Sequence, residues 1–413
     1  MSELAINGGT PVRSHSYPTW PMWDQREVDA VTEVIKSGEW GGIPGKKCWE
    51  FADAFAQRQG AAHGVPVMNG TCALQVALRA VGVGPGDEVI VPALTWIATP
   101  QAALYLGAIA VFCDVEPDTF NLDPASFEAA ISSRTKAVVP VHLGGLPANL
   151  DTVLAIARKH KLAVIEDCAH AHGAAWRGRG VGSWGDFGCF SFQQSKVITS
   201  GEGGCILTND KHLAELAASL VNCGRFQESD ETLTEHPFAY NFRLTDLQAA
   251  VLLAQLSRLD ELTARRARNA DLLDGALGEV AGLAPVRRDP NVTRQAYYLY
   301  FFRYDTEKFG GLSREDFCNA LKAEGVPCGP ARQLVYKSPL FGANPLRSAT
   351  AVIPGPNGLV DYSEVYCPVA EDVAGRTGVV VMQNALLGSE EDTLDIARAA
   401  RKVREQQREL VAT

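Results

Sequence analysis

The chain has 413 residues, 46% of them hydrophobic and 21% charged, with a formal net charge of −10. This composition is typical of a globular protein with a large core, and the length favours two or more lobes rather than one. No cluster of Lys and Arg stands out, which argues against a surface for nucleic acid or anionic membrane. The ten cysteines include no Cys-x-x-Cys pair, and residues 1–16 contain no apolar signal core. We therefore expect a reduced, cytoplasmic protein without a metal site.

Residues 60–210 alternate short β-type runs with helical patterns, which predicts a mostly parallel sheet with helices on both faces. Residues 89–113 carry no charge, but Pro92 and Pro100 interrupt them. We interpret this stretch as strand, loop, helix and strand rather than as a membrane span. The predicted strands are 88–91, 110–113, 137–141, 162–166, 187–192 and 205–208, and the predicted helices are 71–81 and 150–160.

The pattern changes after Thr245. A long helix is predicted from 246 to about 273, because leucines recur at helical spacing at 252, 256, 259 and 262. We expect an α/β fold with a large domain at 1–265 and a smaller α+β domain at 266–413. The polar segment 225–240 is predicted to be a surface loop. The other expected elements of the second domain are strands at 297–304 and 378–382 and helices at 313–324 and 390–404.

The start of the helix predicted at 71–81 is a candidate anion site. Asn69 or Thr71 can cap this helix, and a start that contains Gly70 leaves backbone N–H groups available to a phosphate. A capped helix without a ligand is the commoner outcome of such a motif. This segment alone therefore does not decide the chemistry.

Asp167 ends the apolar run 163–167, at the carboxyl end of a predicted strand, where sheets of this kind bind their ligands. A carboxylate there can hold the protonated ring nitrogen of a cofactor, close an acidic turn or bind a metal. His170 and His172 follow closely, but they alternate along the chain and need not converge on one ion.

Lys196 follows the apolar run 187–192 and precedes the turn Gly201-Glu202-Gly203-Gly204. A surface lysine is the ordinary alternative. A lysine held in an apolar site has a lowered pKa and becomes nucleophilic enough to form a Schiff base. Ser191, at the end of the same run, could bind a phosphate.

These segments together resemble the DegT/StrS keto-sugar aminotransferases, which have the fold-type I architecture of aspartate aminotransferase. The resemblance covers nearly the whole chain. Within the family, the chain is most similar to the glutamine-dependent scyllo-inosose and 2-deoxy-scyllo-inosose aminotransferases of aminocyclitol antibiotic pathways. The stretches that carry it are Asn69-Gly70-Thr71, 91–99, 166–170, Gln193-Gln194-Ser195-Lys196, Gly201-Glu202-Gly203-Gly204, Tyr240-Asn241-Phe242-Arg243, 293–298 and 308–312.

The resemblance implies a pyridoxal 5′-phosphate (PLP) cofactor bound to Lys196. Asp167 would pair with the pyridinium nitrogen, and Trp96 would stack on the ring. The remaining implied contacts are Gly70, Thr71 and Ser191 at the phosphate, His170 and Gln193 beside the ring, and Asn241 at the phosphate of a neighbouring subunit. The active unit would then be a homodimer with shared active sites.

The implied reaction is a ping-pong transamination in which L-glutamine or L-glutamate donates an amino group to a ketone on a sugar or cyclitol ring. The Trp40 side chain could face that ring or only pack against the protein, and the sequence favours neither interpretation. Residues 167–173 are also similar to 3-amino-5-hydroxybenzoate synthase, a dehydrating and aromatising branch, and residues 329–337 form a shorter loop than in the cyclitol enzymes. The further alternative is a catalytically silent protein with the PLP fold, which Asp167, Lys196 and Asn241 together argue against.

Overall fold

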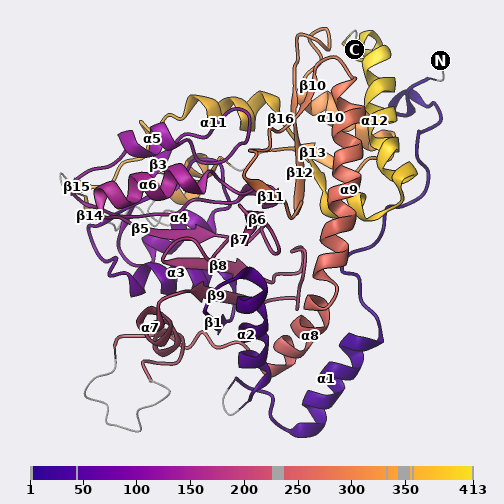
Figure 1. Cartoon of the computed structure of the whole chain (residues 1–413). Coiled ribbons are helices and arrows are strands. Elements are labelled where there is room, and N and C mark those ends of the chain that lie inside the picture. Colours follow the sequence, from indigo (N-terminus) through magenta and orange to yellow (C-terminus); the bar gives the residue numbers. More distant parts are fainter. Residues whose placement is uncertain are drawn as a thin grey trace.

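A computed structural model describes residues 3–42, 45–225, 237–331, 334–342, 354–355 and 358–411. Figure 1 shows one large sheet with its helices, and beside it a smaller sheet packed against long helices that include the C-terminal ones. The predicted α/β class is confirmed.

The large sheet has seven strands in the order β1-β9-β8-β5-β4-β2-β3. The neighbours from β8 to β3 pair in parallel, whereas β9 is antiparallel to both β8 and β1. The predicted strands lie within a few residues of the observed ones, and the predicted mostly parallel arrangement is confirmed. The bounds are β1 (His63–Val67), β2 (Glu88–Pro92), β3 (Ile109–Cys113), β4 (Thr135–Val138), β5 (Ala163–Asp167), β8 (Phe187–Ser191) and β9 (Gly204–Thr208).

Helices cover both faces of this sheet, so its central strands are apolar on both sides. Val164 belongs to one hydrophobic cluster and the next residue, Ile165, to the other. Since side chains alternate along a strand, Glu166 and Asp167 also point to opposite faces. The helices of this part are α1 (Gln25–Ser37), α2 (Lys47–Gln59), α3 (Gly70–Ala80), α4 (Ala98–Leu104), α5 (Pro124–Ala129), α6 (Leu150–His160) and α7 (Lys211–Val221).

A four-stranded antiparallel sheet, ordered β10-β12-β16-β13, forms the second layer system. A third hydrophobic cluster joins it to helices α9 (Leu259–Gly278), α10 and α12 and includes Leu4 and Tyr17 of the N-terminal segment. Residues of the N-terminal segment therefore pack against the part of the chain that follows the boundary predicted at 265/266. The position of that domain boundary stays a prediction. The bounds are β10 (Leu283–Pro285), β12 (Leu299–Tyr304), β13 (Cys328–Pro330), β16 (Gly378–Met382), α10 (Arg314–Ala323) and α12 (Glu390–Glu405).

The remaining elements are short or connect these two systems. The strands are β6 (Ala175–Trp176), β7 (Arg179–Gly180), β11 (Val292–Arg294), β14 (Pro354–Gly355) and β15 (Gly358–Leu359). The helices and helical turns are α11 (Pro368–Asp372), α13 (Gln407–Val411), η1 (Ala5–Asn7), η2 (Leu143–Gly145), η3 (Val335–Lys337), η4 (Pro339–Phe341), η6 (Val373–Thr377) and η7 (Gln383–Leu387).

The prediction of a single helix over 246–273 is wrong, because the structure has two helices there. These are α8 (Asp246–Leu256) and α9 (Leu259–Gly278). At the break, the Ser257 hydroxyl donates to the Ala254 carbonyl at 2.7 Å. The Arg258 guanidinium turns back to bond the Glu27 carboxylate. Helix α9 also continues to Gly278, a few residues past the predicted end near residue 273.

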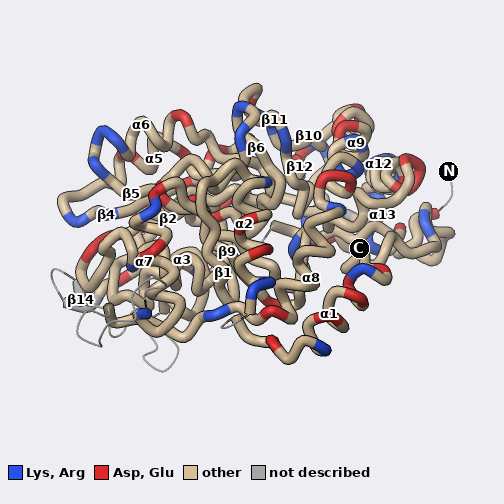
Figure 2. Tube along the Cα trace, turned by 60° about the horizontal axis from the view of Figure 1, so that its bottom comes forward, with Lys and Arg blue, Asp and Glu red and all other residues tan. Residues whose placement is uncertain are grey.

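The uncharged stretch 89–113 forms β2, α4 and β3. Among the described residues, no helix has both the length and the apolar character needed to cross a membrane. All ten cysteines are free thiols and nine are buried, Cys223 being exposed. Most of the predicted loop 225–240, namely 226–236, lies outside the described residues. Figure 2 shows Lys and Arg interspersed with Asp and Glu along most of the described trace, and the last turn of α6 carries Arg158 and Lys159 together.

Candidate functional site

The carboxyl ends of β5 and β8 lie side by side and bring together Asp167 and Ser191, the last residues of these strands. The backbone of Asp167 is fixed by hydrogen bonds to neighbouring chain. Its N–H donates to the Pro140 carbonyl at 2.9 Å, and its carbonyl accepts from the His142 N–H at 3.1 Å. The site is therefore built on the rigid edge of the sheet.

The Asp167 carboxylate is buried and accepts two hydrogen bonds. Thr99 Oγ1 donates to Oδ2 at 2.8 Å, and the Ala169 N–H donates to Oδ1 at 3.1 Å. Burial raises the pKa of Asp167 more than these donors and the nearby Lys196 lower it. A cationic partner would offset that burial, so this carboxylate suits a protonated ring nitrogen.

Lys196 lies on the loop that joins β8 to β9. Within this loop, the Lys196 N–H donates to the Gln193 carbonyl at 2.8 Å. Its Nζ lies 4.4 Å from the centroid of the Tyr298 ring. Burial lowers the pKa of Lys196 to about 8, although Asp167 nearby raises it. The amine is thus partly neutral near physiological pH, which a nucleophile and general base requires.

The start of α3 faces the end of β8. Asn69 caps this helix through a 2.8 Å bond from the Cys72 N–H to its Oδ1. A Cβ on Gly70 would come within 2.7 Å of Ser191 Cβ, so only glycine allows this approach. The N–H groups of Gly70 and Thr71 have no hydrogen-bond partner among the described residues. Together with the Ser191 hydroxyl they form a cradle that fits a phosphate.

His170 and Gln193 lie close to Lys196, but other groups already hold their side chains. His170 stacks on Tyr298 with ring centroids 4.3 Å apart, and its Nδ1 accepts from the Gly144 N–H at 3.3 Å. Burial and the charge of Lys196 depress the pKa of His170 well below its usual value, so the ring is neutral. Gln193 Oε1 accepts from the backbone N–H and the hydroxyl of Ser195 and so braces the lysine loop.

Three predicted site residues lie on the surface of the single chain. The Trp96 indole is 58% exposed and lines a cavity of about 790 Å³ together with Lys337 and Glu371. Trp40 donates its indole N–H to the Ile35 carbonyl at 3.1 Å, and nothing in the described residues joins it to Lys196. Asn241 is exposed. The roles predicted for these side chains stay predictions.

The arrangement fits PLP on chemical grounds. A cradle of free N–H groups and a hydroxyl suits the phosphate, a buried carboxylate with a raised pKa suits the ring nitrogen, and an amine with a lowered pKa suits a Schiff base. Asp167, Lys196, Gly70, Thr71 and Ser191 are the residues that would hold it.

One group of side chains resembles a metal site, but the nitrogen and oxygen atoms of this group are held in hydrogen bonds. Ligand atoms of His142, Glu166 and Cys168 lie within 4.8 Å of one another and are buried. His142 Nδ1 accepts from the Ala148 N–H, so its Nε2 carries the proton that Glu166 Oε2 accepts at 3.1 Å. Glu166 also accepts from three backbone N–H groups, those of Gly182, Trp184 and Gly185. Both ring nitrogens of His142 and both oxygens of Glu166 are therefore engaged, and these bonds brace the turn before β8.

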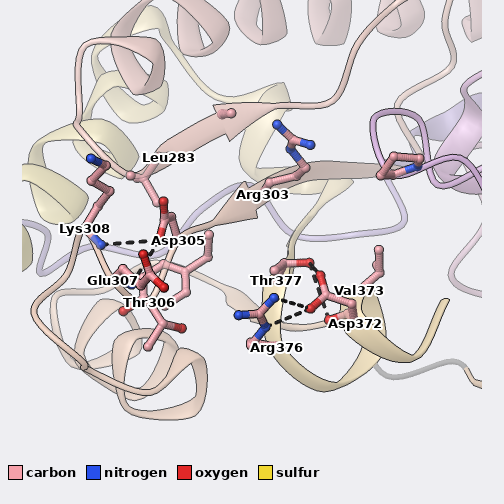
Figure 3. Close-up of a pocket in the computed structure, with 14 residues that line it drawn as sticks. Leu283, Arg303, Asp305, Thr306, Glu307, Lys308, Asp372, Val373, Arg376 and Thr377 are labelled. Carbon is pink, nitrogen blue, oxygen red and sulfur yellow. Dashed lines mark hydrogen bonds and ion pairs between the residues drawn. The ribbon is translucent and has the colours of Figure 1, made fainter. Parts of the chain in front are cut away.

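A second concavity, of about 500 Å³, lies in the small-sheet region (Figure 3). It is lined by charged side chains of both signs, and these are largely paired with each other or with neighbours. Arg376 bonds Asp372 at 2.7 Å, and Arg303 bonds Asp118 at 2.7 Å. None of the residues predicted for the site lines it, so it is separate from the Lys196 site.

Sequence reasoning did not assign roles to Thr99 and Tyr298, although both lie in segments that carry the family resemblance. Thr99 bonds Asp167, and Tyr298 contacts both Lys196 and His170. The only sequence signal was their place in those segments, because neither contact is local in the chain.

Comparison with known proteins agrees with this geometry. Residues 21–352 match the DegT/DnrJ/EryC1/StrS aminotransferase family. The chain is 44% identical to the L-glutamine:2-deoxy-scyllo-inosose aminotransferase of Micromonospora echinospora, over 99% of this chain and all of that one. It is 42% identical to the enzyme of that name from Streptoalloteichus tenebrarius, over 97% of each chain. The crystal structure of 3-amino-5-hydroxybenzoic acid synthase superposes with a TM-score of 0.84 at 33% identity, covering 95% of this chain and all of that one. The chain belongs to the DegT/DnrJ/EryC1/StrS family and is a PLP-dependent aminotransferase of fold-type I.

Proposed function

We propose that this aminotransferase transfers the amino group of L-glutamine to a keto-cyclitol of the scyllo-inosose type, in aminocyclitol biosynthesis. The observation that carries the proposal is full-length identity of 42–44% to relatives named for that reaction. The convergence of Asp167, Lys196 and the α3 cradle on one edge of the sheet supports it.

Each residue of the site has a defined task in this reaction. PLP, when bound, supplies an electron sink for the carbanion that forms at the α-carbon of the donor. The Gly70 and Thr71 N–H groups and the Ser191 hydroxyl hold the phosphate, and the Asp167 carboxylate keeps the ring nitrogen protonated. The Lys196 amine, once released by the donor, accepts the α-proton at Nζ and later returns it.

We further propose a cytoplasmic homodimer in which Asn241 of one subunit reaches the phosphate in the other. Exposed apolar side chains support an interface. Trp23, Val28 and Ile35 lie on or beside α1, and Phe238, at 78% exposed, lies near Asn241. The Trp40 side chain is 54% exposed in the single chain and would become part of the substrate pocket in the assembled dimer.

The test is a visible spectrum of the purified protein before and after glutamine. We expect a band from PLP on Lys196 that bleaches with glutamine and returns when a keto-cyclitol is added. Lys196→Ala should retain PLP through the phosphate cradle but show no bleaching and no turnover. A coloured protein that ignores glutamine would overturn the choice of donor, and a colourless one that takes up no PLP would overturn the site.

A second candidate is the dehydrating and aromatising reaction. The superposition on 3-amino-5-hydroxybenzoic acid synthase favours it. Lys196 could carry the cofactor in both candidate reactions, so its presence does not distinguish them. The chemical nature of the product does. A new aromatic absorbance on turnover would select this second candidate, and a restored cofactor band without aromatic product would select the first.

A further inference from the structure

The loop that carries Lys196 is held by side chains from distant parts of the chain. Three of its carbonyl groups accept hydrogen bonds from outside the large sheet. Trp20 Nε1 donates to the Gln194 carbonyl at 3.0 Å, and Gln383 Nε2 donates to the Ser195 carbonyl at 2.6 Å. Arg266, fully buried on α9, donates to the Val197 carbonyl at 3.5 Å. The loop backbone is therefore fixed, and the position of the amine depends on what the side chain contacts.

The Lys196 side chain contacts one aromatic ring. Its Nζ lies 4.4 Å from the centroid of Tyr298, which belongs to the segment leading into β12 of the small sheet. An ammonium group over an aromatic face is attracted by the ring quadrupole, and the attraction is strongest where water is excluded. His170 stacks on the same ring and limits its movement.

The Tyr298 hydroxyl is engaged as a donor. Ser195 Oγ donates its single proton to Gln193 Oε1 at 2.7 Å, so in the 2.8 Å contact between the two hydroxyls Tyr298 must be the donor. Burial also raises the pKa of Tyr298. This hydroxyl is therefore committed to the lysine loop and is not available as an acid for the substrate.

The backbone around Tyr298 is shaped to bring its ring to this place. Tyr297 has a φ of 52°, a conformation that a bulky residue adopts only under constraint. The Ala296 N–H donates to the Gly145 carbonyl at 3.1 Å. A Cβ on Gly145 would lie 2.9 Å from both Ala296 Cβ and the Tyr297 nitrogen. A strained residue and an obligatory glycine thus aim one side chain at the amine.

We propose that Tyr298 is a positioning residue that holds the Lys196 amine on its ring face and ties the lysine loop to the small sheet through Ser195. The inference rests on the proposed role of Lys196 as the amine that carries PLP and moves the proton. It predicts that the ring matters more than the hydroxyl, because the ring contacts the amine and the hydroxyl only the loop.

The first measurement uses cofactor-free protein, so that it is independent of the proposed reaction. The pH dependence of Lys196 modification by trinitrobenzenesulfonate, followed by mass spectrometry of its peptide, reports the pKa of the amine. Tyr298→Leu removes the π face but still excludes water, so the pKa of Lys196 should fall by roughly 0.5–1 unit. Tyr298→Phe keeps the face and should leave this pKa within about 0.2 unit of that of the parent protein.

The second measurement uses the PLP-loaded enzyme. Tyr298→Leu should lower kcat by about tenfold or more while KM for glutamine changes less than about threefold, because the amine moves but the donor site does not. Tyr298→Phe and Ser195→Ala should each lose less than about fivefold. Circular dichroism checks that each variant is folded, and Tyr298→Met replaces Tyr298→Leu if the latter is not.

An unchanged Lys196 pKa and kcat in folded Tyr298→Leu would overturn the proposal. So would equal losses in Tyr298→Phe and Tyr298→Leu, which would assign the effect to the hydroxyl. If the parent enzyme instead ignores glutamine while the pKa of Lys196 still responds to the ring, the proposed function fails and the positioning role stands.

Discussion

Glu166 and Asp167 are adjacent, buried carboxylates at the end of one strand, and they have opposite environments. Glu166 accepts from His142 and three backbone N–H groups, whereas Asp167 accepts from Thr99 and one backbone N–H. Burial raises the pKa of both, but the donors of Glu166 outweigh it and lower its pKa overall, while the pKa of Asp167 stays raised. A buried carboxylate with a full set of hydrogen-bond donors thus stabilises the fold, whereas one with fewer donors can still bind a cationic ligand.

Asp167→Asn should have the largest effect on activity. The amide cannot stabilise a protonated ring nitrogen, so kcat should fall by on the order of 10²–10³-fold, as when one preorganised electrostatic partner is removed. The free energy of unfolding of the cofactor-free protein should change little. Burial disfavours the ionised Asp167 carboxylate, so removing its charge costs the folded state little. Steady-state kinetics and urea unfolding measure the two effects. A large loss of stability would show that Asp167 stabilises the fold as Glu166 does.

Glu166→Gln should have the converse effect. The amide NH₂ would face backbone N–H donors, so the free energy of unfolding should fall by about 3 kcal/mol. The activity of the molecules that remain folded should stay close to the parent value. The pKa of Glu166 is lower in the folded protein than in the unfolded chain. The ionised Glu166 carboxylate therefore stabilises the folded state at pH values above its pKa in the unfolded chain, near 4.5. This stabilisation is lost as the pH falls through the lower pKa that Glu166 has in the folded protein. The difference from the parent in urea unfolding should shrink between pH 7 and pH 3, and a constant difference would contradict this account.

Lys196→Met extends the comparison to a buried cation. Burial lowers the pKa of Lys196 from 10.5 to about 8, so between these values the unfolded chain binds more protons than the folded one. The stability of the cofactor-free parent should therefore rise with pH across this window. The Met variant should be more stable at pH 7 by about 3 kcal/mol, with the advantage fading toward pH 10.5. Lys136→Met, at an exposed strand position of the same sheet, is the control for replacing a lysine by methionine.

Much of the fold was predictable because its signals are local. The apolar runs that end at Asp167 and Ser191, and the capped helix after Asn69, each follow from a few consecutive residues. The break at Ser257 was not predictable, because Arg258 leaves the helical pattern to reach Glu27, far away in the sequence. The site shows the same division. Lys196 stands out by its flanks, whereas Tyr298 and Arg266 matter only through contacts with the lysine loop across the fold.

Thr99→Val is the finest test of why the two carboxylates differ. It keeps the shape of the side chain but removes the hydrogen bond to Asp167 Oδ2, which lowers the pKa of that carboxyl. The pKa of Asp167 should rise, kcat should fall about three- to tenfold, and the acid limb of the kcat profile should move to higher pH. Thr95, whose hydroxyl lies 2.9 Å from that of Thr99, reaches Asp167 only through it. Thr95→Val should therefore shift the acid limb less than Thr99→Val. If both variants moved it equally, packing around α4 rather than the direct donor would set the charge of Asp167, and the number of hydrogen bonds would no longer explain the contrast with Glu166.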